Sequence, residues 1–166
     1  METELIKRRM PVQIGVNSDP LQPIEKSHMV TLRTLKLLQD RDHPAIITTK
    51  YPGQLTEPEY LRAIDALPLV VQCSVSTEDP VLLSRLEPEA PPLEERLGAL
   101  KTLYEAGAHV MLRLAPYAPD LVGDVDSLLA RAHEAGVQVV QVGPLKIYHA
   151  NGSRQRLNEA LGYNYL

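Results

Sequence analysis

Five short apolar runs that alternate with segments of helical spacing constrain the fold of this chain more than any other feature. They cover residues 12–16, 45–49, 69–75, 110–114 and 137–142, and such lengths are typical of strands. Strands that alternate with helices pair in parallel through right-handed crossovers. The order βαβαβαβαβ therefore predicts an α/β fold, built either as a barrel or as an open doubly wound sheet, and we favour barrel-like curvature.

The segments between these runs carry helix signals. Residues 25–39 bring four apolar side chains to one stripe, namely Met29, Leu32, Leu35 and Leu38. Thr56 and Glu59 form a capping-box pattern, and Asp79 precedes a first-turn proline. Helices are also predicted at residues 93–106 and 125–135, each ending in the repeated sequence Glu-Ala-Gly at Gly107 and Gly136.

The composition fits a single domain over residues 1–166, because 44% of the residues are hydrophobic and no linker interrupts them. No apolar run approaches the roughly 20 residues that a membrane helix needs, and the N-terminal residues have mixed charge. We therefore expect a cytoplasmic protein. The net charge of -4 and the absence of Phe and Trp give no basis for predicting a nucleic-acid partner.

Polar residues occupy every second position of several predicted strands, although a strand buried on both faces would be continuously apolar. The set comprises Gln13, Asn17, Thr48, Lys50, Gln72, Ser74, Ser76, His109, Arg113 and Gln141. Within a strand its members share one face, so we expect a ligand cavity on that face, near the carboxyl ends of the strands. The alternative is a sheet whose polar face is solvated or internally hydrogen-bonded.

Several motifs follow one another at the predicted strand ends. They include Gly15-Val16-Asn17-Ser18-Asp19-Pro20, Ile47-Thr48-Thr49-Lys50, Val71-Gln72-Cys73-Ser74-Val75-Ser76 and Leu114-Ala115-Pro116. From about Pro11 to Ile147 this series resembles the radical S-adenosylmethionine (SAM) proteins related to spore photoproduct lyase. The resemblance implies a partial (β/α) TIM-type barrel of parallel strands without the first strand, with SAM lying across the strand ends near an iron–sulfur cluster.

The same resemblance implies contacts with SAM. Ser18 and Asp19, next to Asn17, would meet its amino group and Lys50 its carboxylate. Ser74 or Ser76 would meet the carboxylate or the ribose hydroxyls, and the backbone around Gly143 would face adenine. These residue types suit a zwitterionic amino acid and a ribose. Arg113 shares the polar face by position alone, where a ligand contact and a structural ion pair both fit.

The chain departs from this family at the cluster. The family holds its [4Fe-4S] cluster with a CxxxCxxC loop, which this sequence lacks, and Cys73 is its only cysteine. Cys73 alone cannot ligate a cluster, and we expect it to face the helices as a small hydrophobe. Cluster ligands would have to come from a missing segment or a partner chain. The sequence leaves open a truncated or split gene product and a cluster-free descendant that binds SAM only.

Two other functions stay open. The chain could be a non-catalytic module that pairs with a partner through the open sheet edge near the first strand. It could also be an aldolase-like barrel enzyme with Lys50 as a Schiff-base nucleophile. We predict no metal site, because the five histidines have no metal-binding spacing. The acidic group Asp120, Asp124 and Asp126 is expected to cap the following helix. For Glu87 and Arg96, an ion pair or a solvated loop is as good an explanation as a ligand contact.

Overall fold

The computed structural model describes residues 7–147 and 152–165. Its strands are β1 (Val12–Ile14), β2 (Ala45–Thr49), β3 (Leu69–Val75), β4 (His109–Tyr117) and β5 (Val139–Pro144). The helices are α2 (Glu25–His28), α3 (Val30–Gln39), the 3₁₀ helix η1 (Pro52–Thr56), α4 (Pro58–Ile64), α5 (Pro80–Leu86), α6 (Leu93–Glu105), α7 (Val125–Glu134) and α8 (Ser153–Leu161). Each of the five predicted strands is confirmed. β2 and β3 have the predicted ends, and the ends of the other three strands differ from the prediction by at most three residues.

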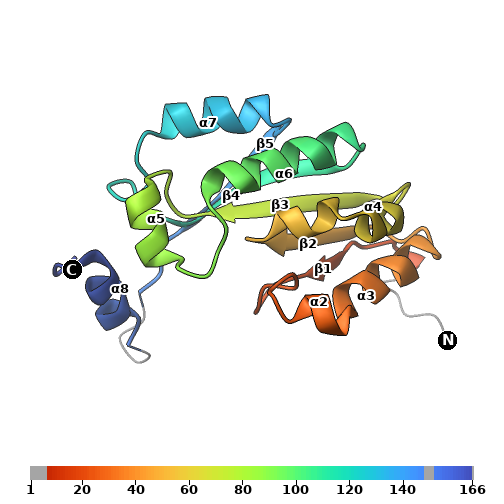
Figure 1. Cartoon of the computed structure of the whole chain (residues 1–166), viewed down its shortest axis with the longest axis horizontal. Helices are drawn as coiled ribbons and strands as arrows, with labels where there is room; N and C mark the ends of the chain where they lie inside the picture. The colour runs from red at the N-terminus through yellow and green to blue at the C-terminus, as the bar shows by residue number, and fades with distance from the viewer. Residues whose placement is uncertain (1–6, 148–151, 166) are drawn as a thin grey trace.

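The five strands form one parallel sheet in the order β1-β2-β3-β4-β5, which confirms the predicted α/β fold. The strand order never reverses, whereas a doubly wound sheet changes direction at a switch point. Right-handed crossovers that always advance in one direction leave their helices on one face. Figure 1 shows α3, α4, α6 and α7 arranged in this way, with α8 beyond α5 at the far end of the molecule.

The face of the sheet under these helices carries the main core. Ile47, Val71 and Leu112 are fully buried at its centre, against Leu35 of α3 and Leu100 of α6. Every second residue of β2 is buried, as expected for a sheet covered on one face.

Cys73 belongs to this helix-covered core. It is fully buried, and its burial raises the pKa of the thiol to about 12. The predicted role of Cys73 as a small core hydrophobe is therefore confirmed.

The opposite face is polar, as predicted. Gln13 Nε2 donates to Thr48 Oγ1 at 3.0 Å, and Thr48 Oγ1 donates to Gln72 Oε1 at 2.8 Å. This row crosses β1, β2 and β3 in the middle of the sheet. Its members satisfy one another, so this part of the polar face needs no ligand. The residues nearer the strand ends are not in the row.

Two predicted helix signals are wrong. The helix expected over residues 25–39 is interrupted at Met29, whose φ of 51° is left-handed and whose side chain is 43% exposed instead of buried. The buried Glu25 explains the break, because its carboxylate accepts the N–H groups of Val30 and Leu32 at the start of α3.

The capping box is the second error. Thr56 Oγ1 donates to Gly53 O inside η1, and α4 begins after Glu57 without a side-chain cap.

The remaining caps agree with the sequence. Asp79 Oδ1 accepts from the N–H groups of Val81 and Leu82 at the start of α5, and Asp124 accepts from Ser127 at the start of α7. Gly107 and Gly136 follow α6 and α7 with φ near 90°, the left-handed conformation that favours glycine at a helix end. Along the described parts of the chain, no helix has both the length and the apolar character needed to span a bilayer.

Candidate functional site

The carboxyl ends of β1, β2 and β3, with Arg113 from the middle of β4, surround a cavity of about 390 Å³, which we call the strand-end cavity. Six of the eight predicted site residues line it, from four separate segments of the chain: Asn17, Ser18, Asp19, Lys50, Ser74 and Arg113. The parallel register explains the convergence, because Thr48 pairs with Gln72 and Ser74 with Arg113 across neighbouring strands. Residues that follow these pairs meet at the same edge of the sheet.

The other two predicted residues lie beside this cavity. Gly143 of β5 is next to Arg113, since a Cβ atom at Gly143 would lie 3.9 Å from Arg113 Nη2. Ser76 follows β3 and lines an adjoining cavity, which it shares with Lys50. The structure therefore brings Gly143 to the same neighbourhood and separates Ser76 from the main group.

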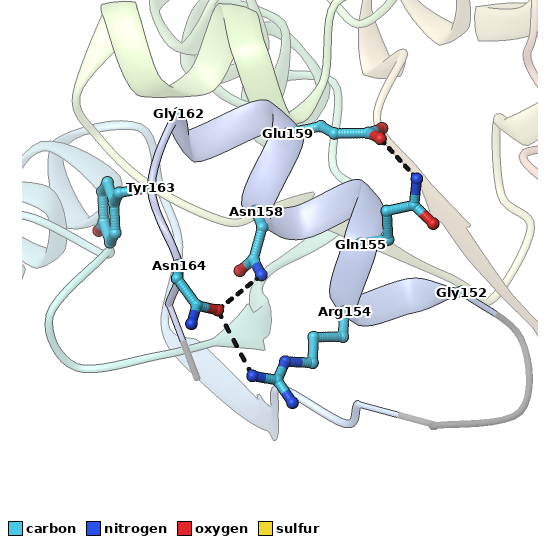
Figure 2. Close-up of a pocket in the computed structure, with 8 residues that line it drawn as sticks. All are labelled: Gly152, Arg154, Gln155, Asn158, Glu159, Gly162, Tyr163 and Asn164. Carbon is cyan, nitrogen blue, oxygen red and sulfur yellow. Dashed lines mark hydrogen bonds between the residues drawn. The ribbon is translucent and has the colours of Figure 1, made fainter.

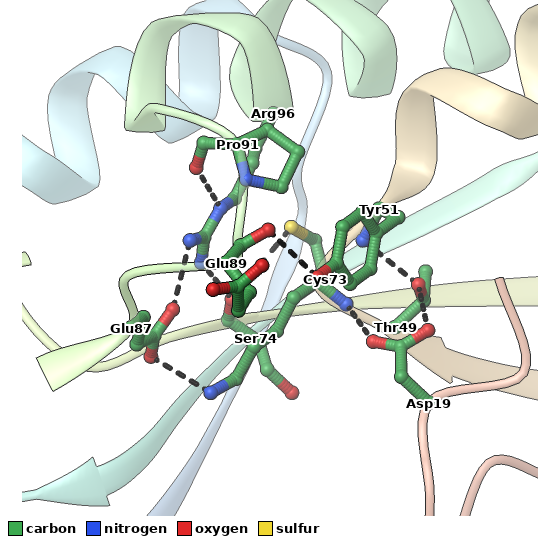
Figure 3. Close-up of polar contacts among 10 residues, drawn as sticks. Asp19, Thr49, Tyr51, Cys73, Ser74, Glu87, Glu89, Pro91 and Arg96 are labelled. Carbon is green, nitrogen blue, oxygen red and sulfur yellow. Dashed lines mark hydrogen bonds and ion pairs between the residues drawn. The ribbon is translucent and has the colours of Figure 1, made fainter. Parts of the chain in front are cut away.

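The Asp19 carboxylate is already engaged by the protein. Oδ1 accepts from Leu21 N at 3.0 Å. Oδ1 also accepts from Thr49 Oγ1 at 2.7 Å, and Oδ2 accepts from Lys50 N at 2.6 Å (Figure 3). A carboxylate offers about four acceptor positions, so about one remains. Asp19 mainly ties the loop after β1 to the end of β2, which the sequence did not indicate.

Lys50 is held by a buried ion-pair network. Its Nζ lies 3.2 Å from Glu87 Oε1, and Glu87 Oε2 lies 2.8 Å from Arg96 Nη2. The side chains of Glu87 and Arg96 are 2% and 0% exposed, and that of Lys50 is 35% exposed. These two contacts fall outside hydrogen-bond geometry, so charge holds Glu87 between its partners.

Arg96 fixes this network to the backbone. Its Nη1 donates to Ser74 O at 2.8 Å and its Nε to Pro91 O at 2.7 Å (Figure 3). Glu87 and Arg96 therefore form a structural ion pair rather than a solvated loop. Because the contact with Glu87 lies outside hydrogen-bond geometry, the N–H groups of Lys50 remain for other acceptors. The network also makes Lys50 a charge partner, which disfavours the Schiff-base role.

Arg113, Asn17 and Ser18 supply the uncommitted polar groups. Across the described residues, no hydrogen bond or ion pair joins the Arg113 guanidinium to another side chain. Arg113 is only half-buried. Asn17 and Ser18 are exposed at the opposite rim, on the loop after β1. The Arg113 guanidinium is therefore available to bind an anionic group that enters the cavity.

Three residues that shape the cavity were not among the predicted site residues, although the sequence analysis weighed one of them, Glu87. Tyr51 and Glu89 line it, and the Tyr51 hydroxyl donates to Glu89 O at 2.7 Å. Burial, and then the Asp19 carboxylate, raise the pKa of Tyr51 above its usual value. The third residue is Glu87, which lies beneath Lys50. The adjacency of Tyr51 to Lys50 was the only signal in the sequence, because the loop with residues 87–91 reaches the site through tertiary packing.

The charges around the cavity suit a zwitterion. Lys50 and Arg113 contribute positive charge, and Asp19 and Glu89 contribute negative charge. A ligand with one carboxylate and one ammonium would find opposite charges for both, with hydroxyls from Ser18 and Ser74 nearby.

The same residues do not fit an iron–sulfur cluster. Cys73 is the only thiol, and it is buried in the core under the helices rather than in the cavity. Within residues 7–147 and 152–165, no group of three or more His, Cys, Asp or Glu side chains has the arrangement of a metal site. We therefore assign no iron–sulfur chemistry to this chain.

A larger hollow of about 620 Å³ lies on α8, away from the strand ends (Figure 2). Its polar side chains bond to one another. Asn158 Nδ2 donates to Asn164 Oδ1 at 2.9 Å, and Gln155 Nε2 donates to Glu159 Oε1 at 2.8 Å. It contains none of the predicted site residues, so we assign no ligand to it.

Comparison with curated proteins finds relatives that are much longer. Over 112 residues the chain is 31% identical to the uncharacterized protein MJ0683 of Methanocaldococcus jannaschii, which covers 68% of this chain and 42% of that protein. Over 152 residues it is 30% identical to the uncharacterized protein Rv2578c of Mycobacterium tuberculosis, which covers 88% of this chain and 43% of that protein. The chain spans less than half the length of these relatives. No protein-family model matches it.

Proposed function

We propose that the chain is a radical SAM-like partial barrel that binds SAM in the strand-end cavity. The observation that carries the proposal is the convergence of six predicted residues from four segments on one cavity. The singly wound parallel sheet supports it, because a (β/α) barrel also adds its strands in sequential order with the helices outside. The zwitterionic balance of the cavity supports the choice of ligand.

The free groups of the cavity suggest how SAM would be oriented. Its carboxylate would meet Arg113, with a further contact to the ammonium of Lys50. Its amino group would meet Ser18 and the remaining acceptor position of Asp19. Ser74 would contact the ribose, and the backbone at Gly143 would face adenine. This assignment moves the principal contact of the SAM carboxylate from Lys50 to Arg113, because the Lys50 ammonium already forms an ion pair with Glu87.

The proposed activity of this chain is binding. Reductive cleavage of SAM needs an electron from a cluster, and the residues of this chain do not fit one. The greater length of the relatives is compatible with cluster ligands that lie outside the matched region. Radical chemistry would therefore depend on a segment or partner that supplies them.

Calorimetric titration with SAM tests this proposal. We expect Arg113→Ala to weaken binding about 10- to 100-fold, because it removes a charged hydrogen-bond donor worth about 1.5–3 kcal/mol. Ser18→Ala should weaken binding several-fold, and the control Arg62→Ala on the exposed face of α4 should leave it unchanged. Absence of SAM binding by the parent chain, or equal losses in Arg113→Ala and Arg62→Ala, would contradict the proposal.

A second candidate function is a non-catalytic module that pairs through an open sheet edge. Both β1 and β5 end the sheet, and β5 is the more apolar edge, since Val139, Val140 and Val142 are 52%, 37% and 55% exposed. Exposed apolar edge strands are templates for pairing with another chain. This observation moves the predicted pairing edge from β1 to β5.

Mass measurement in solution tests the interaction module. We expect light scattering to give at least twice the mass of 18.5 kDa, and Val142→Lys to restore the monomer by placing a charge on β5. The matched control is Val81→Lys, which changes an exposed valine of α5 instead. A monomeric parent at high concentration, with no partner chain bound, would rule out this function.

A further inference from the structure

A second cavity, of about 240 Å³, adjoins the strand-end cavity on the side of α5 and α8, and we call it the leucine cavity. Its apolar walls come from Pro116, Ala118 and four leucines: Leu86 of α5, Leu121, Leu145, and Leu157 of α8. Leu86, Leu145 and Leu157 are only partly buried, although they pack in the smaller hydrophobic cluster of the molecule. These three leucines therefore keep apolar surface that the protein does not cover.

Ser76 gives this cavity an uncharged polar group. The residue is 4% exposed, and its Oγ has no hydrogen-bond partner in the described part of the chain. A buried hydroxyl normally has a partner, and one without it is unfavourable. A ligand in the cavity that Ser76 lines would supply this partner.

The charges at the edge of the cavity indicate the class of ligand. Lys50 and Glu87 both line it with their charged groups 3.2 Å apart, and Glu87 also pairs with Arg96. A charged ligand would lose its hydration among the leucines, and the cation on this wall, Lys50, is already paired with Glu87 and also lines the strand-end cavity. An uncharged ligand with a hydroxyl or carbonyl would satisfy Ser76 and bury its apolar part.

We propose that the leucine cavity binds a small uncharged molecule made of one ring or short chain and one hydroxyl or carbonyl group. An engineered cavity of about 150 Å³ lined by apolar residues holds benzene, so the leucine cavity has room for a substituted ring. Because Lys50 lines both cavities, this ligand would lie beside the proposed SAM site. The inference goes beyond SAM binding and does not depend on it.

Titration of the isotope-labelled protein with phenol, followed by amide chemical shifts, tests this inference. Toluene is the matched probe, because it has the same ring without the hydroxyl. We expect phenol to shift the amides of Ser76, Leu145 and Leu157 and to bind at least 10-fold more tightly than toluene. In Ser76→Ala, that preference should fall below threefold while toluene still binds.

Filling the cavity provides the second variant. Leu157→Trp should abolish binding of both probes. Leu157→Ala should keep the binding of both probes, and it is the second variant to measure where tryptophan disturbs α8. A preference for phenol that survives Ser76→Ala, or equal binding of phenol and toluene to the parent, would overturn the inference. Lys50 and Arg113 are unchanged in these variants, so the SAM titration remains an independent measurement.

Discussion

Replacing Glu87 with alanine should lower the free energy of unfolding by about 3–5 kcal/mol, the usual cost of removing one partner from a buried ion pair. The Arg96 side chain is 0% exposed, so without Glu87 its charge would remain buried with only the carbonyl groups of Ser74 and Pro91 as partners. Arg96 cannot release this charge by deprotonation. Urea unfolding followed by circular dichroism measures the loss.

Two variants separate this effect from general disturbance of the loop. Glu89→Ala removes an exposed carboxylate two residues away and should change stability little, because only the backbone oxygen of Glu89 bonds to Tyr51. Lys50→Ala should cost about 1 kcal/mol or less, because the Lys50 side chain is partly exposed and screened by solvent. Similar small losses in Glu87→Ala and Glu89→Ala would show that Glu87 does not compensate Arg96.

The regular elements could be predicted because they depend on local patterns. Alternation of apolar residues along β2 and β3 gave both strands with their ends, and Asp79 followed by Pro80 gave the start of α5. The break at Met29 could not be predicted in this way. It depends on the Glu25 carboxylate, which also accepts from the Tyr60 hydroxyl 35 residues away. Long-range partners of this kind leave no periodic signal.

The helix α8 shows another limit of pattern analysis. Its sequence, SRQRLNEAL, has few apolar residues, and Leu161 is its only buried residue. The partly buried Leu157 of the same helix packs against the leucines beside α5 in the smaller cluster. A short polar helix gains its position from such tertiary contacts rather than from propensity. The leucine cavity depends on α8 and was therefore beyond sequence reasoning.

The membership of the strand-end cavity was predictable, but the availability of its groups was not. Ser18, Lys50 and Ser74 follow or lie near the ends of neighbouring parallel strands, where such positions converge at one edge of the sheet. Arg113 lies in the middle of β4 and joins them because it pairs with Ser74. Whether each group is free depends on partners elsewhere. Glu87 reaches Lys50 and Thr49 reaches Asp19 only in the folded chain, whereas Arg113 has no such partner among the described residues. The structure therefore changes the roles expected for these residues more than it changes which residues line the strand-end cavity.

Gly15→Ala should have the second large effect, lowering the free energy of unfolding by about 2–5 kcal/mol. Gly15 has a φ of +91°, and a Cβ atom built there lies 2.3 Å from the Thr48 carbonyl oxygen and 2.9 Å from Pro20 Cδ. The Thr48 carbonyl belongs to the backbone of β2 and is held in the sheet. The loop after β1 therefore has to move to make room for the added Cβ atom. That loop carries Asn17, Ser18 and Asp19 into the strand-end cavity, and SAM affinity should fall together with stability.

Gly98→Ala is the matched control for this substitution. Gly98 lies on the exposed side of α6 without positive φ, and nothing lies within 4 Å of an added Cβ atom. The same change in chemistry should raise stability by about 0.5–1 kcal/mol, because alanine favours the helix interior. Urea unfolding and SAM titration of both variants distinguish two causes. A loss of SAM affinity in Gly15→Ala alone, measured where that variant remains folded, would trace binding to the position of the loop, whereas unchanged affinity would place the SAM site elsewhere.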